Sequence, residues 1–179
     1  MHRNSSHRNL ENIHRLSLEN GFLLMMRIIP IPLVNNTLMR LVNFISASEP
    51  RLFQRLEGHH HKWFVIDATN LPFIICLRPD PKSPRLKASR NRDCPNAACR
   101  ISGSFLTLLG MIDGRYDGDA LFFSRDIYIE GDTEAVVCLR NALDDIDGNI
   151  ADYVAHFFGK PGKKILNIAR KVTPHAHPT

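Results

Sequence analysis

Histidine, cysteine and aspartate residues cluster at three places where their spacing invites a metal-binding interpretation. The triplet His59-His61 lacks a carboxylate or cysteine in the same segment, so we interpret it as a solvated turn. Cys94 and Cys99 lack the second close pair that a structural zinc site uses. The acidic run 144–149 fails as a calcium loop, because His156 stands where a bidentate glutamate is needed. The sequence therefore predicts no metal site.

Catalytic motifs are equally weak. No serine, cysteine or aspartate lies in a nucleophile motif such as Gly-x-Ser-x-Gly. The run Gly159 to Lys164 misses a phosphate-binding loop, since Lys164 replaces the required serine or threonine. We interpret residues 159–162 as a basic turn between two helices, with contact to anionic lipid as the alternative. These observations favour a binding protein over an enzyme. An enzyme whose catalytic site is assembled from residues distant in the sequence stays open as a further hypothesis.

Composition and charge narrow the class of protein. The 179 residues, 44% hydrophobic and 23% charged, suit one globular domain with a full core. A net charge of +5 favours anionic partners, namely phospholipid head groups, nucleic acid or acidic proteins. Nucleic acid is disfavoured, because the aromatic residues lie in apolar segments and do not alternate with Arg and Lys. The cysteines at 76, 94, 99 and 138 are irregularly spaced, which predicts reduced thiols and a cytoplasmic protein.

The most apolar run, Phe22 to Val34, is too short to span a bilayer. It contains Arg27 and is broken by Pro30 and Pro32, whereas a spanning helix needs about 20 apolar residues. We interpret it as two helices packed on the domain, with shallow insertion at a membrane surface as the alternative. The expected location is therefore cytoplasmic, with peripheral contact at the inner face of the membrane left open.

The stretch from Asp126 to Asp144 predicts a strand followed by a helix. Residues 126–130 alternate polar and apolar side chains, as a half-buried strand does. Gly131 permits a sharp turn, and Asp132 is a good N-cap for a helix in which Thr133 and Glu134 form the first turn. Apolar residues then recur at helical spacing on one face.

The rest of the chain alternates between the two periodicities. Helices are expected over 18–29, 33–45, 48–56, 104–114, from 150 to 158 and beyond 162, and strands over 62–69, 72–77, 86–89 and 97–102. The first two strands are close enough to form a hairpin. Four or five strands grouped with these helices predict an α+β fold in which helices cover one face of the sheet.

The same residues carry a family resemblance. Over about twenty-five residues the chain resembles the sterol carrier protein type 2 (SCP2-like) domain, and within it the UbiT-like accessory factors of anaerobic, oxygen-independent ubiquinone biosynthesis. The matching positions are Leu121, Phe122, Phe123, Arg125, Gly131, Asp132, Thr133, Glu134, Arg140 and Asn141. Arg140 departs conservatively from the family's usual lysine. The segment from Arg78 to Cys99 departs more, since its prolines and basic residues indicate a longer or more irregular excursion than the family norm.

The resemblance implies a mostly antiparallel four- to five-stranded sheet covered by helices, with an apolar tunnel between the two layers. The tunnel would hold a prenylquinone or a phospholipid, and no cofactor. Its expected wall, with the last two residues as a lid, consists of Phe105, Leu106, Leu109, Phe122, Phe123, Ile127, Ile129, Val136, Leu139, Leu143, Phe157 and Phe158. The implied partners are iron–sulfur proteins related to U32 peptidases, together with a transient membrane surface.

These expectations divide the chain into segments. Residues 1–15 form a disordered arm, 16–57 N-terminal helices, 58–147 the SCP2-like lipid-binding core, 148–173 C-terminal amphipathic helices and 174–179 a loose tail. The leading hypothesis is a non-catalytic lipid-binding accessory protein. The alternative is a protein–protein interaction scaffold whose interior is filled and whose basic surface binds an acidic partner.

Overall fold

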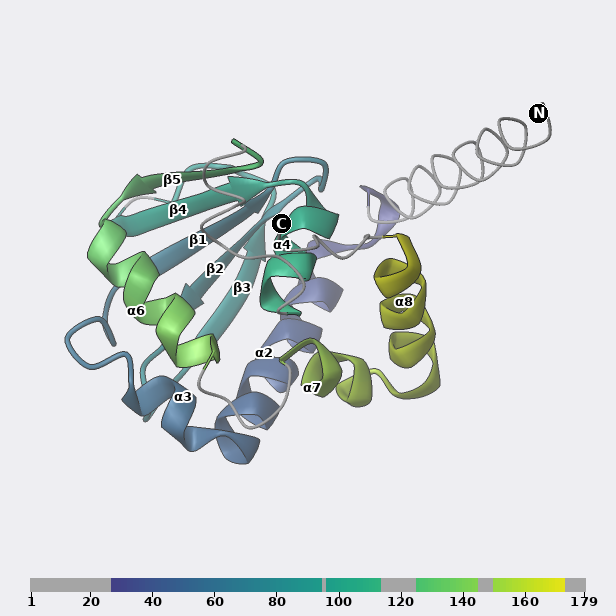
Figure 1. The fold of residues 1–179 in the computed structure, drawn as a ribbon, viewed down its shortest axis with the longest axis horizontal. Helices are drawn as coiled ribbons and strands as arrows, with labels where there is room; N and C mark the ends of the chain where they lie inside the picture. Colours follow the sequence, from purple (N-terminus) through teal and green to yellow (C-terminus); the bar gives the residue numbers. More distant parts are fainter. Residues whose placement is uncertain (1–26, 95, 114–124, 145–149, 173–179) are drawn as a thin grey trace, which may run out of the picture.

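The computed structural model describes residues 27–94, 96–113, 125–144 and 150–172. Five strands form a single sheet, with helices before, between and after them (Figure 1). In chain order the elements are α2 (Ile31–Ser48), α3 (Pro50–Gln54), β1 (Trp63–Ala68), β2 (Ile74–Arg78), β3 (Arg85–Ser89), β4 (Ala97–Gly103), α4 (Phe105–Ile112), β5 (Ile127–Gly131), α6 (Thr133–Asp144), α7 (Ile150–Phe157) and α8 (Gly159–Val172). The α+β prediction is confirmed.

The sheet has the strand order β3-β2-β1-β4-β5. β1 and β2 pair antiparallel, which confirms the predicted hairpin, and β2–β3 and β4–β5 are also antiparallel. The central pair, β1 and β4, is parallel, with Ile66 opposite Ile101. A parallel pair needs a long connection, and here that connection consists of the β2–β3 hairpin and the segment that follows it.

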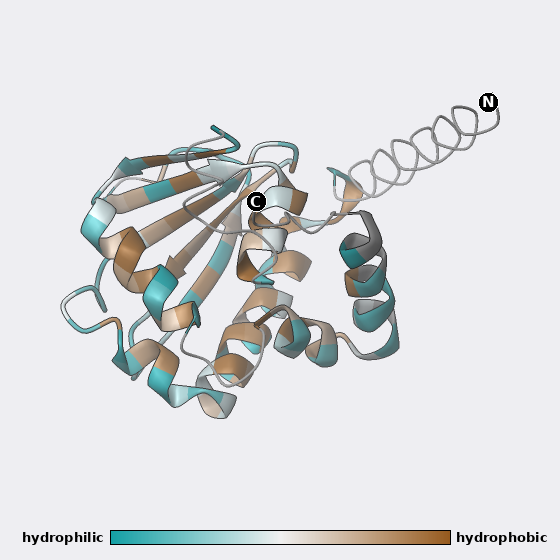
Figure 2. Cartoon of the chain, viewed as in Figure 1, coloured by the Kyte–Doolittle hydropathy of each residue, from teal (hydrophilic) through white to brown (hydrophobic). Residues whose placement is uncertain are grey.

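The described helices that pack on the sheet cover one of its faces (Figure 1). Hydrophobic residues alternate with hydrophilic ones along the edge strand β3, whereas the central strands β1 and β2 are mostly hydrophobic (Figure 2). On the covered face Phe64 of β1 and Ile101 of β4 join the main core with Val42 of α2 and Ala135 of α6. α2 also closes the edge of the sheet, because the Ala88 backbone N–H of β3 donates to Asn35 Oδ1 at 2.6 Å.

The opposite face is covered by the chain between β3 and β4. Val65, Ile74 and Cys76 are buried there, and Cys94 packs against them. Asp67, 6% exposed, accepts hydrogen bonds from the guanidinium groups of Arg92 and Arg100. These bonds tie the Arg78 to Cys99 excursion to the sheet.

The turn between β5 and α6 is built as its sequence predicts. Gly131 has φ +87°, and a Cβ there would run into the carbonyl oxygen of Ala98. Asp132 Oδ1 accepts from the Ala135 backbone N–H at 3.0 Å, so it caps α6. Asp132 Oδ2 accepts from Lys62 Nζ at 2.8 Å, which joins this turn to the start of β1.

This ion pair makes the stability of the fold dependent on pH in the acid range. The Asp132 carboxylate accepts hydrogen bonds from Lys62 Nζ and from the Ala135 backbone N–H, and these two bonds hold the pKa of Asp132 below its ordinary value of 3.8. A carboxyl group with a lowered folded pKa stabilises the fold above its unfolded pKa, and this contribution is lost as the pH falls through the folded value. We expect Asp132→Asn, which keeps a capping oxygen, to flatten the decline in urea-unfolding free energy from about pH 5 to about pH 2. A decline as steep as in the unmodified protein would contradict this assignment.

Two sequence predictions about helix ends are wrong. Residues 159–162 are the first turn of α8 rather than a linker, because Gly162 packs so tightly on α7 that a Cβ there would lie 2.5 Å from the Ala155 carbonyl oxygen. A proline is tolerated in a first helical turn, so Pro161 does not prevent the helix from starting here.

The helix predicted over 48–56 corresponds to α3, which is shorter than predicted. Its N-cap is Glu49, whose side chain makes no capping hydrogen bond. The helix predicted over 18–29 lies almost wholly outside the described residues.

Candidate functional site

A row of isoleucines crosses the helix-covered face of the sheet. Ile66 of β1 pairs with Ile75 of β2 on one side and Ile101 of β4 on the other, and Ile101 pairs in turn with Ile129 of β5. Ile101 is 5% exposed, but Ile66, Ile75 and Ile129 are only partly buried. Solvent-accessible apolar surface therefore remains on the inner side of a layered fold.

The positions of the helices explain why this surface stays accessible. α4 and α6 approach β4, α6 also approaches β5, and α2 approaches β3. No described helix approaches the middle strands β1 and β2 as closely. In β1 itself Phe64 is fully buried whereas Ile66, two residues later on the same face, is not. On this face of β1 both Phe64 and Ala68 are buried, and Ile66 between them keeps part of its apolar surface accessible.

The wall residues expected from the sequence fall into three groups in the structure. Ile127, Val136 and Leu139 are buried in the main core, and Phe158 is 43% exposed. The partly buried ones are Phe105, Leu106, Leu109, Ile129, Leu143 and Phe157. Phe122 and Phe123 lie outside the described residues. Leu109 packs against the α7–α8 cluster, so it lies apart from the main core.

Sequence reasoning missed Ile66, Ile75 and Ile101, which form most of the row. The alternation along residues 62–69 does place Phe64, Ile66 and Ala68 on one face. The local pattern contains no information on which strand lies beside β1 or in which register. Without the strand order and register, the sequence does not show that these isoleucines lie side by side.

Of the three polar clusters considered for metal binding, the acidic run lies outside the described residues from 145 to 149. Among the residues that the structure describes, no group of three or more His, Cys, Asp or Glu could hold a metal ion. The solvated-turn interpretation of the histidines is wrong in part. His61 is exposed, but His59 is only 9% exposed and His60 Nε2 lies 2.9 Å from the Phe53 carbonyl oxygen, because this turn packs against α3.

The cysteines are free thiols in the structure. Burial, helped by a hydrogen bond with the Cys94 thiol, raises the pKa of Cys76 to about 12, and burial with the nearby Asp132 carboxylate raises the pKa of Cys99 to about 11. A thiol reacts as its thiolate, so these groups are suppressed as nucleophiles.

The four thiols should therefore differ in their rates of alkylation in the folded protein. We expect iodoacetamide to modify the partly exposed Cys94 and Cys138 at least about tenfold faster than Cys76 and Cys99. Peptide mapping by mass spectrometry measures the order. Labelling in urea is the control, since unfolding should equalise the four rates, and rapid native labelling of Cys99 would show that its strand is not packed as described.

The arrangement of a mostly antiparallel sheet, helices on one face and accessible apolar side chains between them is that of a lipid-binding fold. The chain belongs to the SCP-2 sterol transfer family, whose model matches residues 42–144. No curated protein sequence matches the chain.

Solved structures resemble this chain, and the first of those named here shares its fold. One, described as "UbiJ-SCP2 Ubiquinone synthesis protein", has a TM-score of 0.53 at 19% identity, covering 65% of this chain and 93% of its own. Sterol Carrier Protein 2 from Yarrowia lipolytica in its apo form has a TM-score of 0.46 at 11% identity, covering 65% of this chain and 91% of its own. None of the described helices is long and apolar enough to cross a membrane.

Proposed function

We propose that this protein is a non-catalytic lipid carrier that holds a prenylquinone, or a phospholipid, against the isoleucine row. The observation that carries the proposal is the partial exposure of Ile66, Ile75 and Ile129 on the helix side of the sheet. Membership of a sterol transfer family supports it. The wall of the site would include the partly buried Phe105 of α4 and Leu143 of α6, which pack against the main core, and the partly buried Leu106 of α4.

The binding energy in such a site comes from removing apolar surface from water. About 25 cal/mol is gained per Å² buried, or about 0.8 kcal/mol per methylene group. A ligand without a tail gains little, whereas each added isoprene unit adds several buried carbons. The protein requires no cofactor for this task, because it holds and presents the molecule without changing it.

The ring of a ubiquinone precursor is the chemical group that such a carrier would present. A protein named for ubiquinone synthesis shares the fold, which supports this direction. The receiving enzymes would be the oxygen-independent hydroxylases of ubiquinone biosynthesis, iron–sulfur proteins related to U32 peptidases. The carrier would work in the cytoplasm and touch the inner face of the membrane to load.

Lipid extraction from the purified protein tests the proposal. We expect mass spectrometry of the organic extract to find a prenylquinone or phospholipid in near-stoichiometric amount. Added quinones that differ only in the number of isoprene units should bind about tenfold or more tightly for each unit, until the tail exceeds the site. Protein that neither retains nor takes up any of these molecules would refute the carrier and favour the scaffold hypothesis.

A further inference from the structure

Helix α8 carries a one-sided positive charge. It contains five Lys and Arg residues and no Asp or Glu. Lys160, Lys163 and Lys164 are exposed, and helical spacing places them on one side of the helix. Gly162 and Leu166 are buried and pack towards α7. The three lysines therefore point away from the body of the protein.

The position of these lysines is unfavourable for the helix alone. They lie in its first two turns, where the backbone dipole favours acidic residues, and the first turn has none. Among the described residues, none forms an ion pair with them, whereas Arg170 of the same helix is paired with Asp113 and Asp152. A negatively charged surface outside the molecule would offset this repulsion.

An exposed aromatic ring lies beside the lysines. Phe158 stands between α7 and α8, next to the break at Gly159 (φ +65°), and is 43% exposed. Its ring meets the ring of Phe157 edge-on at 5.2 Å, and Phe157 packs against Phe44 of α2 at 5.7 Å. A continuous apolar path thus leads from the surface to the core.

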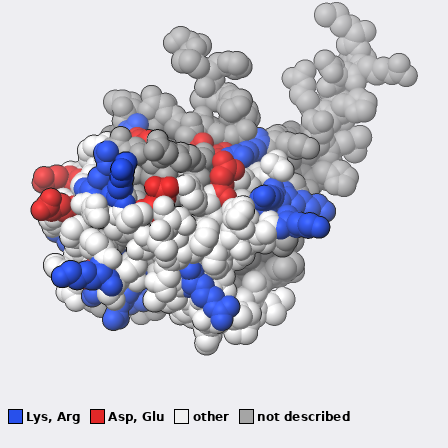
Figure 3. All heavy atoms as spheres, turned by 90° about the horizontal axis from the view of Figure 1, so that it is seen from below, with Lys and Arg blue, Asp and Glu red and all other residues white. Residues whose placement is uncertain are grey.

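We propose that Phe158, Lys160, Lys163 and Lys164 form a surface, here called the α8 basic surface, that docks on a bilayer containing anionic phospholipids. Seen from below, Lys and Arg side chains are spread over the face of the molecule, and one group lies at the side that α8 occupies (Figure 3). The inference rests on the proposed carrier function, because docking would bring the site to its lipid.

A bilayer fits this surface better than a protein partner does. Lysine is depleted from protein–protein interfaces, which centre on a packed apolar core larger than one phenylalanine. Lysines bind lipid phosphates as mobile point charges, without the fixed geometry of an arginine fork. Stable attachment to a membrane takes two signals, and here they are a cluster of cations and an aromatic side chain that can insert shallowly.

Vesicle co-sedimentation tests the electrostatic half of the proposal. The protein should bind vesicles of equal parts phosphatidylglycerol and phosphatidylcholine, and bind pure phosphatidylcholine far more weakly. Each lysine near an anionic surface contributes about fivefold in affinity, so the triple variant K160E/K163E/K164E should lose about 100-fold or more.

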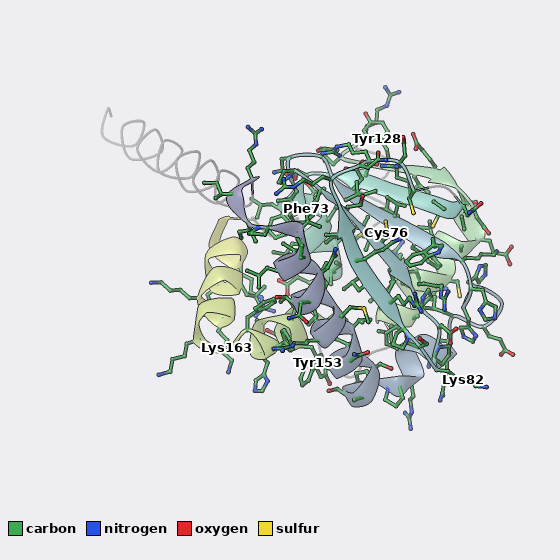
Figure 4. All side chains as sticks on the ribbon, turned by 180° about the vertical axis from the view of Figure 1, so that it is seen from behind. Phe73, Cys76, Lys82, Tyr128, Tyr153 and Lys163 are labelled. Carbon is green, nitrogen blue, oxygen red and sulfur yellow. The ribbon has the colours of Figure 1, made fainter. Side chains whose placement is uncertain are left out.

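A matched variant separates this surface from net charge. K82E/R85E/K87E makes the same change in net charge on the β2–β3 hairpin, and Figure 4 labels Lys82 and Lys163 at opposite sides of the molecule. We expect this control to lose less than about fivefold. Equal losses in the two variants would overturn the α8 basic surface and leave only long-range attraction. Circular dichroism verifies that both variants are folded.

Tryptophan fluorescence tests whether the side chain at position 158 inserts into the bilayer. Phe158→Trp should show a blue shift on adding anionic vesicles, whereas Tyr128→Trp, at a position 59% exposed on β5, should show none. The signal of Trp63 is common to both variants and subtracts out. If anionic vesicles leave the emission maximum of Phe158→Trp unchanged, the proposed insertion of residue 158 is refuted.

The outcomes also separate this inference from the carrier function. Vesicle binding by protein that never retains lipid would refute the carrier and leave the docking surface standing. Lipid retention by protein that ignores anionic vesicles would refute the docking surface and leave the carrier standing.

Discussion

Replacing Ile66 with tryptophan is expected to lower lipid retention about 30-fold while the protein stays folded. Ile66 is only partly buried on the covered face, and the proposed lipid site would give a larger side chain room there without displacing its neighbours. The indole would occupy space that two or three methylene groups of a lipid tail need. At about 0.8 kcal/mol each, their exclusion removes about 2 kcal/mol of binding energy.

The same substitution at Ile101 is the control. Ile101 lies beside Ile66 in the adjacent strand but is 5% exposed and packed in the main core. Inserting extra volume at a filled position forces neighbouring groups apart and costs about 1–3 kcal/mol or more. Urea unfolding should therefore find Ile101→Trp clearly destabilised and Ile66→Trp within about 1 kcal/mol of the unmodified protein.

This pair of variants decides between the two main hypotheses. A filled interior, as the scaffold hypothesis requires, would make both substitutions equally destabilising. An open interior without lipid would leave Ile66→Trp stable and retention unchanged at zero. Only a lipid carrier predicts a stable Ile66→Trp variant whose extract has lost its lipid.

The β5–α6 unit could be predicted from sequence because its determinants are local. Gly131 and Asp132 are adjacent, and each specifies one feature of the turn, a left-handed backbone and an N-cap. The bond from Lys62 to Asp132 could not be predicted in this way. It joins residues 70 positions apart in the chain, so it depends on the position of β1 relative to α6.

The isoleucine row depends on long-range information for the same reason. The sequence predicts each strand from its own composition or alternation, but a parallel β1–β4 pair leaves no local signature. The error at residues 159–162 has a different cause. Gly and Pro usually mark a turn, but here the close approach of Gly162 to Ala155 outweighs local propensity and extends the helix.

The substitution Arg170→Met, which removes the guanidinium group, is expected to destabilise the fold by about 3 kcal/mol. Arg170 donates from Nη2 to Asp113 Oδ1 at 2.6 Å and from Nε to Oδ2 at 3.0 Å. The Asp113 side chain is only 3% exposed, and it follows the last residue of α4. Breaking a buried pair by removing one partner costs about 3–5 kcal/mol, and the lower end applies because the Arg170 side chain is 28% exposed.

Two further variants test whether the buried partner is the cause. Asp152 also contacts Arg170, at 3.0 Å, but its side chain is 57% exposed, so Asp152→Asn should cost less than about 1 kcal/mol. Adding Asp113→Asn to Arg170→Met should recover part of the loss, because a neutral amide is easier to bury than a carboxylate. Urea unfolding measures all four proteins. A cost for Arg170→Met no larger than that for Asp152→Asn would contradict the assignment.

The part of the fold that Arg170→Met destabilises also tests the role of Arg170. Arg170 links α8 to α7 and to the end of α4, so its loss should release α8 before the sheet is affected. Hydrogen exchange should accelerate in α8 while peptides from β1 and β4 keep their protection. Because Lys160, Lys163 and Lys164 belong to this helix, Arg170→Met should also weaken binding to anionic vesicles, although its side chain is not part of the α8 basic surface. Unchanged exchange in α8 would mean that its packing on α7, through Gly162 and Leu166, suffices to hold it.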